Sequence, residues 1–322
     1  MNRREFGALV LCGLSSLSRG AFAADGKARI GYLSWFPESM RADLDRFREG
    51  MRQLGYTEGK TYEVEAYFTG ADADLTRRMA QKLVGEPVDA IVVVATPAAH
   101  IVKAASQTIP IVIYCANALA TGLVPSLAHP GGNTTGVSLL MTDLAGKRLD
   151  LLRQIRPSLT AVGFLGSTRD PNAQTFVHET QAAADRLKLK LSVRLVDGPE
   201  GTDPALFADM KRDGCEAVVV QPIFTGYQDK IVPMAMQAGL PSVSDWAVFA
   251  DAGALMTYGA PQAALMRRTA YYVDRILKGA RPGDLPVEQP TEFELVVNAR
   301  TAARLGWTIP QDVLVRADRV IE

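Results

Sequence analysis

The sequence predicts an α/β fold made of two doubly wound, parallel-sheet lobes in tandem. Short apolar runs alternate with amphipathic stretches from Lys27 onward, which is the pattern of a strand and helix alternation. The run Val88-Asp-Ala-Ile-Val-Val-Val94 is too continuous for a half-exposed strand and indicates a parallel strand covered on both faces. The same alternation begins again at Ala161, so a second lobe is expected.

The first lobe is expected to follow the order βαβαβαβ. Its strands are placed at residues 30–33, 62–68, 88–94 and 109–114. Helices are placed between them at 41–54, where Gly55 ends the helix, and at 74–84 and 98–106.

The second lobe is expected to repeat this order. Its strands are placed at residues 161–165, 191–196, 217–220 and 240–243, and its helices at 172–187, 204–212 and 227–237. Corresponding points such as Ala90 and Ala217 lie roughly 130 residues apart, which is the size of a domain rather than of a solenoid repeat.

Composition favours a small-molecule or protein partner. The chain has 322 residues and 48% hydrophobic content, enough for two modest cores. Lys plus Arg and Asp plus Glu both number 35, so no basic field attracts nucleic acid or an anionic membrane. The motifs GxSxG, GxxxxGK[ST] and HExxH are absent, as is GxGxxG after the first strand, and the histidines lack metal-ligand spacing. We therefore expect no catalysis, no cofactor and no metal.

Residues 1–23 are expected to be a signal peptide. Arg3-Arg4 precede an apolar run, and Ala21-Phe22-Ala23 supplies small residues for cleavage after Ala23. The arginine pair also fits a twin-arginine signal, so the export route stays open. An uncleaved anchor is disfavoured because a membrane span needs roughly 20 apolar residues. A lipoprotein site at Cys12 is disfavoured by the large Leu11. A periplasmic, soluble protein is expected.

Cleavage would leave two cysteines, Cys115 and Cys215. Neither has a CxxC partner, and both are interpreted as small buried hydrophobes. A disulfide between them is the alternative, although they fall in different lobes.

The architecture predicts the position of a binding site. In open α/β sheets ligands bind beyond the carboxyl ends of the strands, and two facing lobes form a cleft between two such edges. The candidate ligand-binding residues all lie at these strand ends or beside them. They are Ser34, Trp35, Phe36, Thr96, Pro97, Ala98, Tyr114 and Asn117 in the first lobe, and Ser167, Gln221, Phe224, Asp245, Trp246 and Tyr258 in the second.

Thr96-Pro97 is a candidate carboxylate site. A threonine followed by proline in the first helical turn is typical of a helix cap, and the free amides beyond it attract negative charge. The Thr96 hydroxyl and the Ala98 amide are expected to hold a carboxylate. The alternative is that Thr96 only caps its own helix.

The aromatic residues are candidate walls for an apolar ligand body. Trp35 and Phe36 are expected to face Phe224 and Trp246 across the cleft, with ordinary core packing as the alternative. Asp245 is a candidate partner for an ammonium group, or else a cap of a turn or helix.

Several segments in order carry a family resemblance. They are EGMRQLGYTEG, VDAIVVVATPAA, IPIV, the pair Gly122-Leu123, PGGNTTGVS and ILKGARPGDLPVEQPTEFELVVNARTAARLGWTIP. Together they resemble the ABC-transporter substrate-binding proteins of the tryptophan/tyrosine-uptake type, over nearly the whole mature chain. The resemblance implies a type I periplasmic binding protein, a monomer that closes over a small ligand and delivers it to a membrane permease.

The resemblance also implies how the lobes are connected. The segment PGGNTTGVS, with glycines suited to positive φ, is expected to approach a hinge rather than bind phosphate. The chain is expected to cross near 137–142, to return near 258–261, and to cross a third time after the helix 262–277. The first lobe then comprises residues 27–140 plus 260–290, and the second 141–259 plus 291–322.

Departures from the family pattern bear on the ligand. Asn117-Ala118 stands where Asp-Pro is common, and Pro222-Ile223-Phe224 stands where Asp-Asn is common. Ala260-Pro261 follows the retained Tyr258-Gly259. We therefore expect a more apolar pocket, for a carboxylate with an aromatic or branched apolar body: an aromatic amino acid or a related organic acid. A ligand-sensing exported domain and a sugar binder or enzyme on the same fold are the alternatives.

Overall fold

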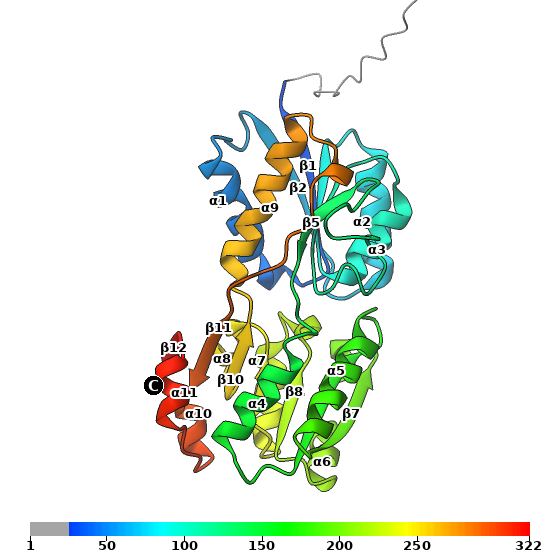
Figure 1. The fold of residues 1–322 in the computed structure, drawn as a ribbon. Helices are drawn as coiled ribbons and strands as arrows, with labels where there is room; N and C mark the ends of the chain where they lie inside the picture. The colour runs from blue at the N-terminus through cyan, green and yellow to red at the C-terminus, as the bar shows by residue number, and fades with distance from the viewer. Residues whose placement is uncertain (1–25) are drawn as a thin grey trace, which may run out of the picture.

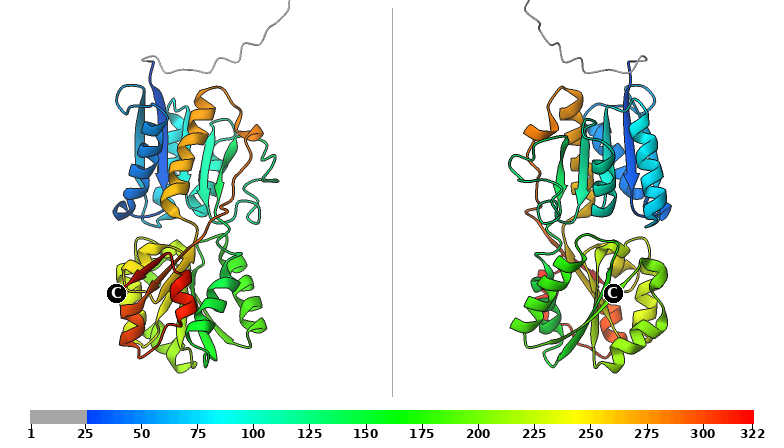
Figure 2. Two further views of the ribbon diagram at one scale, coloured as in Figure 1. Left: turned by 60° about the vertical axis from the view of Figure 1, so that its left-hand side comes forward. Right: turned by 90° about the vertical axis from the view of Figure 1, so that its right-hand side faces the viewer.

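The computed structural model describes residues 26–322 as two α/β lobes stacked end to end (Figures 1 and 2). The expected signal peptide, residues 1–23, lies outside the described residues. Among the helices from residue 26 onward, none is long and apolar enough to cross a membrane.

The first lobe is built on a five-stranded parallel sheet in the order β2-β1-β3-β4-β5. Helices α1 and α9 cover one face, and α2 and α3 cover the other (Figure 1). The strands are β1 (Ala28–Ser34), β2 (Tyr62–Phe68), β3 (Ala90–Val94), β4 (Ile111–Cys115) and β5 (Thr134–Ser138), and the helices are α1 (Ala42–Gln53), α2 (Ala73–Gly85), α3 (Thr96–Ala105) and α9 (Gln262–Leu277).

The second lobe contains a seven-stranded sheet in the order β12-β11-β10-β9-β8-β6-β7. Within it, β7-β6-β8-β9-β10 has the same order as the first sheet, which confirms the expected repeat of two parallel-sheet lobes. The added strand β11 runs antiparallel to β10. The strands are β6 (Ala161–Ser167), β7 (Lys190–Val196), β8 (Ala217–Val220), β9 (Ser242–Ser244), β10 (Met256–Gly259), β11 (Glu294–Asn298) and β12 (Arg319–Ile321).

Helices cover both faces of the second sheet. They are α4 (Ala145–Ile155), α5 (Ala173–Arg186), α6 (Pro204–Arg212), α7 (Gln228–Gln237), α8 (Ala247–Asp251), α10 (Ala299–Arg304) and α11 (Gln311–Arg316). Helices α4 and α5 pack together, and α7 contacts both α6 and α8. The sequence reasoning did not assign α4, β10 or the short elements α8, α11 and β12.

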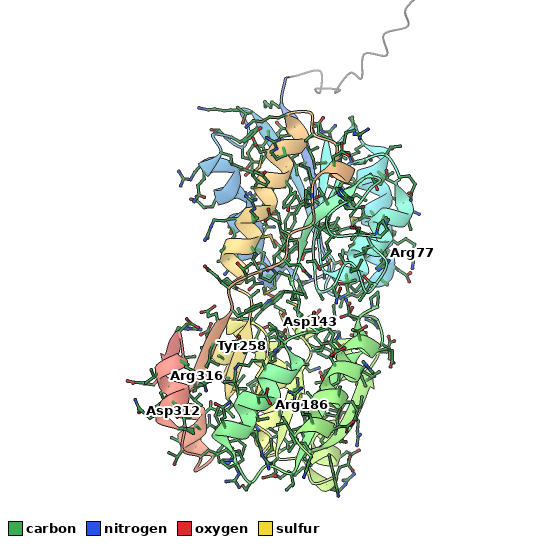
Figure 3. All side chains as sticks on the ribbon, in the orientation of Figure 1. Arg77, Asp143, Arg186, Tyr258, Asp312 and Arg316 are labelled. Carbon is green, nitrogen blue, oxygen red and sulfur yellow. The ribbon has the colours of Figure 1, made fainter. Side chains whose placement is uncertain are left out.

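The chain passes between the two sheets three times within residues 26–322 (Figure 1). It leaves the first sheet after β5, returns between β10 and α9, and leaves again between Glu288, which pairs with β5, and β11. Asp143 lies in the first crossing, and Tyr258 lies in β10 just before the second (Figure 3).

Two expected strands begin later than the apolar pattern suggests. The strand expected at 88–94 begins at Ala90, and the strand expected at 109–114 begins at Ile111, after Pro110. Proline has no amide hydrogen to donate to a sheet, which explains the second difference.

Helix α9 belongs to the first lobe although its sequence follows the second. It packs on α1 so closely that a Cβ on Gly50 would lie 2.6 Å from the Arg267 carbonyl oxygen. A continuous set of buried apolar side chains fills both lobes, including the strands β3 and β4, in which every residue is buried. The strand order of each sheet reverses next to β1 and β6, and these two positions are the switch points of the sheets.

Candidate functional site

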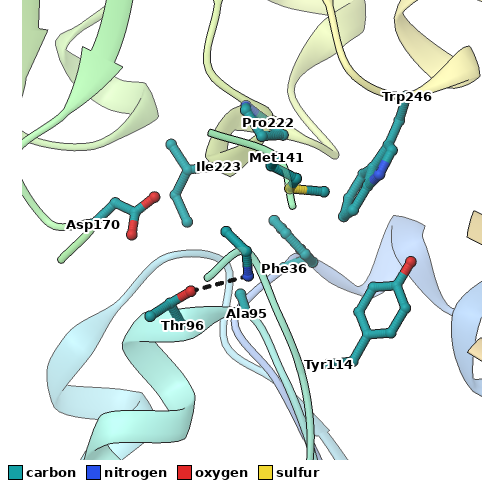
Figure 4. Close-up of a pocket in the computed structure, with 10 residues that line it drawn as sticks. Phe36, Ala95, Thr96, Tyr114, Met141, Asp170, Pro222, Ile223 and Trp246 are labelled. Carbon is teal, nitrogen blue, oxygen red and sulfur yellow. Dashed lines mark hydrogen bonds between the residues drawn. The ribbon is translucent and has the colours of Figure 1, made fainter. Parts of the chain in front are cut away.

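A pocket lies between the lobes at the carboxyl ends of the strands (Figure 4). Its enclosed volume is about 20 Å³, and the space including its open mouth is about 310 Å³. The larger value includes open solvent, and the smaller one, which holds about one water molecule, is far below the roughly 300–1,000 Å³ of small-molecule sites. A larger ligand therefore needs the lobes or the lining side chains to move apart. The lining residues are Phe36, Ala95, Thr96, Tyr114, Ala116, Met141, Asp170, Pro222, Ile223 and Trp246.

The pocket has a polar end and an aromatic end. Figure 4 shows Thr96 and Asp170 toward one side and Trp246 and Tyr114 toward the other, with Met141 and Ile223 between. Such an arrangement suits a molecule with a charged head and an apolar body.

Thr96 lines the polar end, but it is not the helix cap that the sequence predicts. The N-cap residue of α3 is Ala95, at φ 78°. Thr96 is already the first helical residue, and Pro97 follows it in the first turn. The Thr96 hydroxyl accepts hydrogen bonds from Asn172 Nδ2 at 2.8 Å and from the Ala116 amide at 3.3 Å. Its hydroxyl is therefore held by Asn172 of the opposite lobe and by Ala116 of its own lobe, and not by its own helix.

Asp170 is the carboxylate among the residues that line this pocket, and it was not among the residues expected from the sequence. It lies three residues beyond the end of β6, and its carboxylate accepts bonds from Gln221 Nε2 at 2.6 Å and from the Asn172 amide at 2.9 Å. Burial raises the pKa of the Asp170 carboxyl to about 6, while the bonds from Asn172 oppose the rise. The available signal was the sequence Asp170-Pro-Asn172, five residues beyond the strand expected at 161–165, which is typical of a turn at the carboxyl edge.

The aromatic end is formed by three rings from both lobes. Phe36 meets Trp246 edge to face with ring centroids 5.9 Å apart, and Tyr114 lies 6.3 Å from Trp246. Trp35 and Phe224, which were expected to form part of the walls, are buried but do not line the pocket.

Asp245 already has a partner, which corrects its expected role toward an ammonium group. Its carboxylate pairs with the Arg148 guanidinium, and both side chains are buried. Burial raises the pKa of the Asp245 carboxyl, and the Arg148 charge opposes that rise. Arg148 also donates to the carbonyl oxygens of Met141 at 3.0 Å and Tyr258 at 2.9 Å, so the pair joins two of the crossing segments.

The remaining candidate residues support the site from outside its lining. Gln221 holds Asp170, and the Ser34 and Ser167 hydroxyls accept bonds from the amides of Phe36 and Arg169 in their own turns. Asn117 donates to Thr142 at 3.2 Å in the first crossing. Pro97 and Ala98 are buried in α3, and Tyr258 stacks on Phe293 with ring centroids 6.0 Å apart.

Besides the bond from Asn172 to Thr96, two further hydrogen bonds join the lobes. The turn Gly70-Ala71 of the first lobe, in which both residues have positive φ, presents two carbonyl oxygens to the second lobe. Tyr227 Oη donates to the Gly70 oxygen at 2.9 Å, and Arg169 Nη1 donates to the Ala71 oxygen at 3.0 Å. Arg169 is itself held by Asp197 and Glu200.

No metal centre is found in the part of the chain that the structure describes, because no three His, Cys, Asp or Glu side chains cluster there. Cys115 and Cys215 are both buried and free, so the expected burial is confirmed and the alternative disulfide is not formed. Burial raises the pKa of both thiols.

Two facing α/β lobes with a pocket at their switch points define a small-molecule binding protein of the hinged, two-lobe class. Residues 37–321 match the family model described as ABC transporter substrate binding protein. The chain belongs to this family, and the expected resemblance is confirmed.

Known proteins of similar sequence and structure agree with this assignment. A tyrosine-binding protein of Clostridioides difficile is 22% identical over 267 residues, covering 81% of this chain and 77% of its own. An L-Trp complex of an ABC domain from Streptococcus pneumonia is 26% identical, covers 92% of this chain and all of that chain, and has a TM-score of 0.82. A conserved domain protein from Vibrio cholerae is 25% identical, with coverages of 91% and 99% and a TM-score of 0.83.

Proposed function

We propose that this chain is the exported receptor of an ABC importer and that it closes over an aromatic α-amino acid. The observation that carries the proposal is the position of Thr96 and Asp170 together at the polar end of the pocket, one from each lobe. An α-amino acid has a carboxylate and an ammonium group on one carbon, and it needs one partner of each kind close together.

The carboxylate is assigned to the start of α3. The amide of Ala98 and the hydroxyl of Thr96 lie in the first turn of this ten-residue helix, where the helix dipole favours negative charge. Asn172 of the opposite lobe donates to the Thr96 hydroxyl at 2.8 Å and thereby fixes its orientation. A carboxylate bound to this hydroxyl would therefore depend on the approach of both lobes, which favours closure.

The ammonium group is assigned to Asp170. Among residues 26–322 no cation pairs with this buried carboxylate, and an ammonium group would balance the negative charge that burial opposes. The apolar body then lies among Phe36, Met141 and Trp246, and the relatives that bind tyrosine and L-Trp support an aromatic body.

The remaining parts of the proposal follow from the family. The protein is a monomer in the periplasm, released there after removal of residues 1–23, and it presents its closed form to a membrane permease. It performs no chemistry on the ligand. The first lobe comprises residues 27–140 plus 260–290, and the second comprises 141–259 plus 291–322.

A binding panel tests the proposal. The protein without residues 1–23 is unfolded and refolded to remove carried ligand, and then titrated calorimetrically with tryptophan, tyrosine and phenylalanine and with the matching acids that lack the amine. We expect the amino acids to bind and the amine-free acids to bind at least about tenfold more weakly, since the latter leave Asp170 buried and unpaired. Preference for the amine-free acids would instead define an organic-acid receptor, and binding of neither would contradict the proposed ligand class.

Substitution of the two head-group partners separates their roles. Asp170→Asn should weaken the binding of the amino acids and leave the binding of the amine-free acids unchanged or tighter. Thr96→Val should weaken both series. Ser192→Ala, on β7 and away from the pocket lining, is the matched control.

A further inference from the structure

Two buried polar atoms at the aromatic end of the pocket have no hydrogen-bond partner. Tyr114 Oη and Trp246 Nε1 are both without a partner among residues 26–322, and both side chains line the pocket. Tyr114 is 1% exposed and Trp246 is 3% exposed, so solvent does not reach them. Figure 4 shows the Tyr114 hydroxyl directed toward the side of the pocket where Trp246 lies.

Unpartnered buried polar groups are rare in native proteins, and each requires an explanation. The two atoms come from different lobes, since Tyr114 belongs to β4 and Trp246 follows β9. Their rings lie 6.3 Å apart between centroids. A single group placed between the lobes could therefore satisfy both atoms.

The chemistry of the two atoms limits what that group can be. An indole Nε1–H only donates, so Trp246 requires an acceptor, whereas a phenol hydroxyl both donates and accepts. Phenyl and indole ligand bodies offer no acceptor. An oxygen at the far end of the ligand can accept from Trp246 and exchange a hydrogen bond with Tyr114.

The surrounding charges indicate a neutral oxygen. Arg46, the arginine of α1 whose charge acts on Tyr114, is already paired with Asp43, and Arg148 is paired with Asp245. An anionic group at this end would therefore have no free cation among these side chains to balance it.

We infer that Tyr114 and Trp246 are specificity-determining residues that hydrogen-bond to a neutral oxygen, of the phenol type, at the far end of the ligand's aromatic body. The inference rests on the proposed function, in which Thr96 and Asp170 hold the head group at the opposite end. The ligand then spans the pocket with hydrogen bonds at both ends and aromatic contacts between.

The test compares tyrosine with phenylalanine, which differ only in this oxygen. Calorimetric titration of the refolded protein should give a dissociation constant at least about tenfold lower for tyrosine, since phenylalanine leaves both buried atoms unpaired. Tyr114→Phe and Trp246→Phe should each reduce this preference by weakening tyrosine more than phenylalanine.

Tyr32→Phe is the matched control. Tyr32 is also fully buried with an unpartnered hydroxyl, but it does not line the pocket, so its substitution should leave the tyrosine preference unchanged. Thermal melting of each ligand-free variant tests its folding, and removal of an unpartnered hydroxyl should not lower the melting temperature.

The outcomes separate this inference from the proposed function. If phenylalanine binds as tightly as tyrosine, the aromatic end does not recognise the ligand's phenol oxygen and the inference is overturned, while the head-group assignment stands. If Tyr32→Phe lowers the preference as much as Tyr114→Phe, the inference is also overturned. If tryptophan alone binds, the inference is overturned and the proposed function stands. If none of tyrosine, phenylalanine and tryptophan binds, the proposed function fails and the inference fails with it.

Discussion

Asp170 shows how one buried carboxylate can couple ligand binding to pH. Burial raises its pKa to about 6, so ionisation of this group opposes folding of the ligand-free protein. A ligand with an ammonium group instead favours the ionised form of Asp170, because the ammonium group interacts favourably only with the ionised carboxylate. The same group therefore acts in opposite directions on stability and on binding.

We predict that affinity for the amino acid falls as pH decreases below about 6, by up to tenfold per pH unit, because protonated Asp170 cannot pair with the ammonium group. The stability of the ligand-free protein should receive the opposite contribution, which is lost as pH rises from about 4 to about 6. Calorimetric titrations between pH 4 and pH 8, with urea unfolding over the same range, measure both slopes.

The contribution of Asp43 to the pH dependence must be separated from that of Asp170, because burial raises the pKa of Asp43 to about 6 as well. Asp43 lies on α1 beside Arg46 and outside the pocket lining. Asp43→Asn should keep the pH dependence of affinity, and Asp170→Asn should remove it. Retention of the slope in Asp170→Asn would show that another group controls it.

At the level of single residues, the sequence identified positions better than partners. Phe36, Thr96, Tyr114 and Trp246 were expected at the cleft and do line the pocket. Asp245 was a candidate partner for an ammonium group of the ligand. Its actual partner, Arg148, lies 97 residues away, and no local pattern links the two. Long-range ion pairs depend on tertiary packing, and a single sequence does not contain that information.

At the scale of elements, Arg148 connects α4 to the crossing segments. It is buried, pairs with Asp245 and donates to the carbonyl oxygens of Met141 and Tyr258. We predict that Arg148→Met lowers the free energy of unfolding by about 3–5 kcal/mol, because Asp245 is left buried and unpaired. Urea denaturation monitored by tryptophan fluorescence measures the change.

The double variant Arg148→Met with Asp245→Asn provides the control for this prediction. It removes the uncompensated charge and should recover part of the lost stability. A cost below about 1 kcal/mol for the single variant would mean that water reaches the site and solvates Asp245.

The contact of α1 with α9 depends on a glycine. A Cβ at Gly50 would lie 2.6 Å from the Arg267 oxygen and 2.8 Å from Ala270 Cβ. We predict that Gly50→Ala destabilises the protein by about 1–3 kcal/mol, because the two helices must move apart. Gly85, at the end of α2 with open space around its Cβ position, is the matched control, and thermal unfolding should show Gly85→Ala to be close to neutral.

The regular elements of both lobes could be predicted because their signals are local. The apolar runs gave the core strands, and the repeated order gave the second lobe. Strands β10 and β12 were not assigned because, with four and three residues, they contain too few residues to show a period, and pairing with distant strands decides their structure. Helix α4, of eleven residues, was not assigned either.

At the scale of the whole molecule, binding depends on how the lobes close. The pocket is lined from both lobes, so a ligand contributes to closure only through contacts that exist in the closed form. The turn Gly70-Ala71 does not line the pocket but adds such contacts, because Tyr227 and Arg169 of the second lobe donate to its two carbonyl oxygens. These bonds break when the lobes separate, and they therefore stabilise the closed form alone.

We predict that Tyr227→Phe and Arg169→Gln each weaken ligand binding about three- to tenfold, mainly through faster dissociation, because one hydrogen bond of the closed form is lost in each. Stopped-flow fluorescence of Trp246 and the other tryptophans gives the two rate constants. Tyr56→Phe is the matched control, since the Tyr56 hydroxyl bonds to Asp274 at 3.1 Å within the first lobe. Unchanged dissociation in both variants would show that the bonds at Gly70-Ala71 do not set the lifetime of the closed form. A loss of affinity carried by the association rate would mean that they guide the approach of the lobes instead.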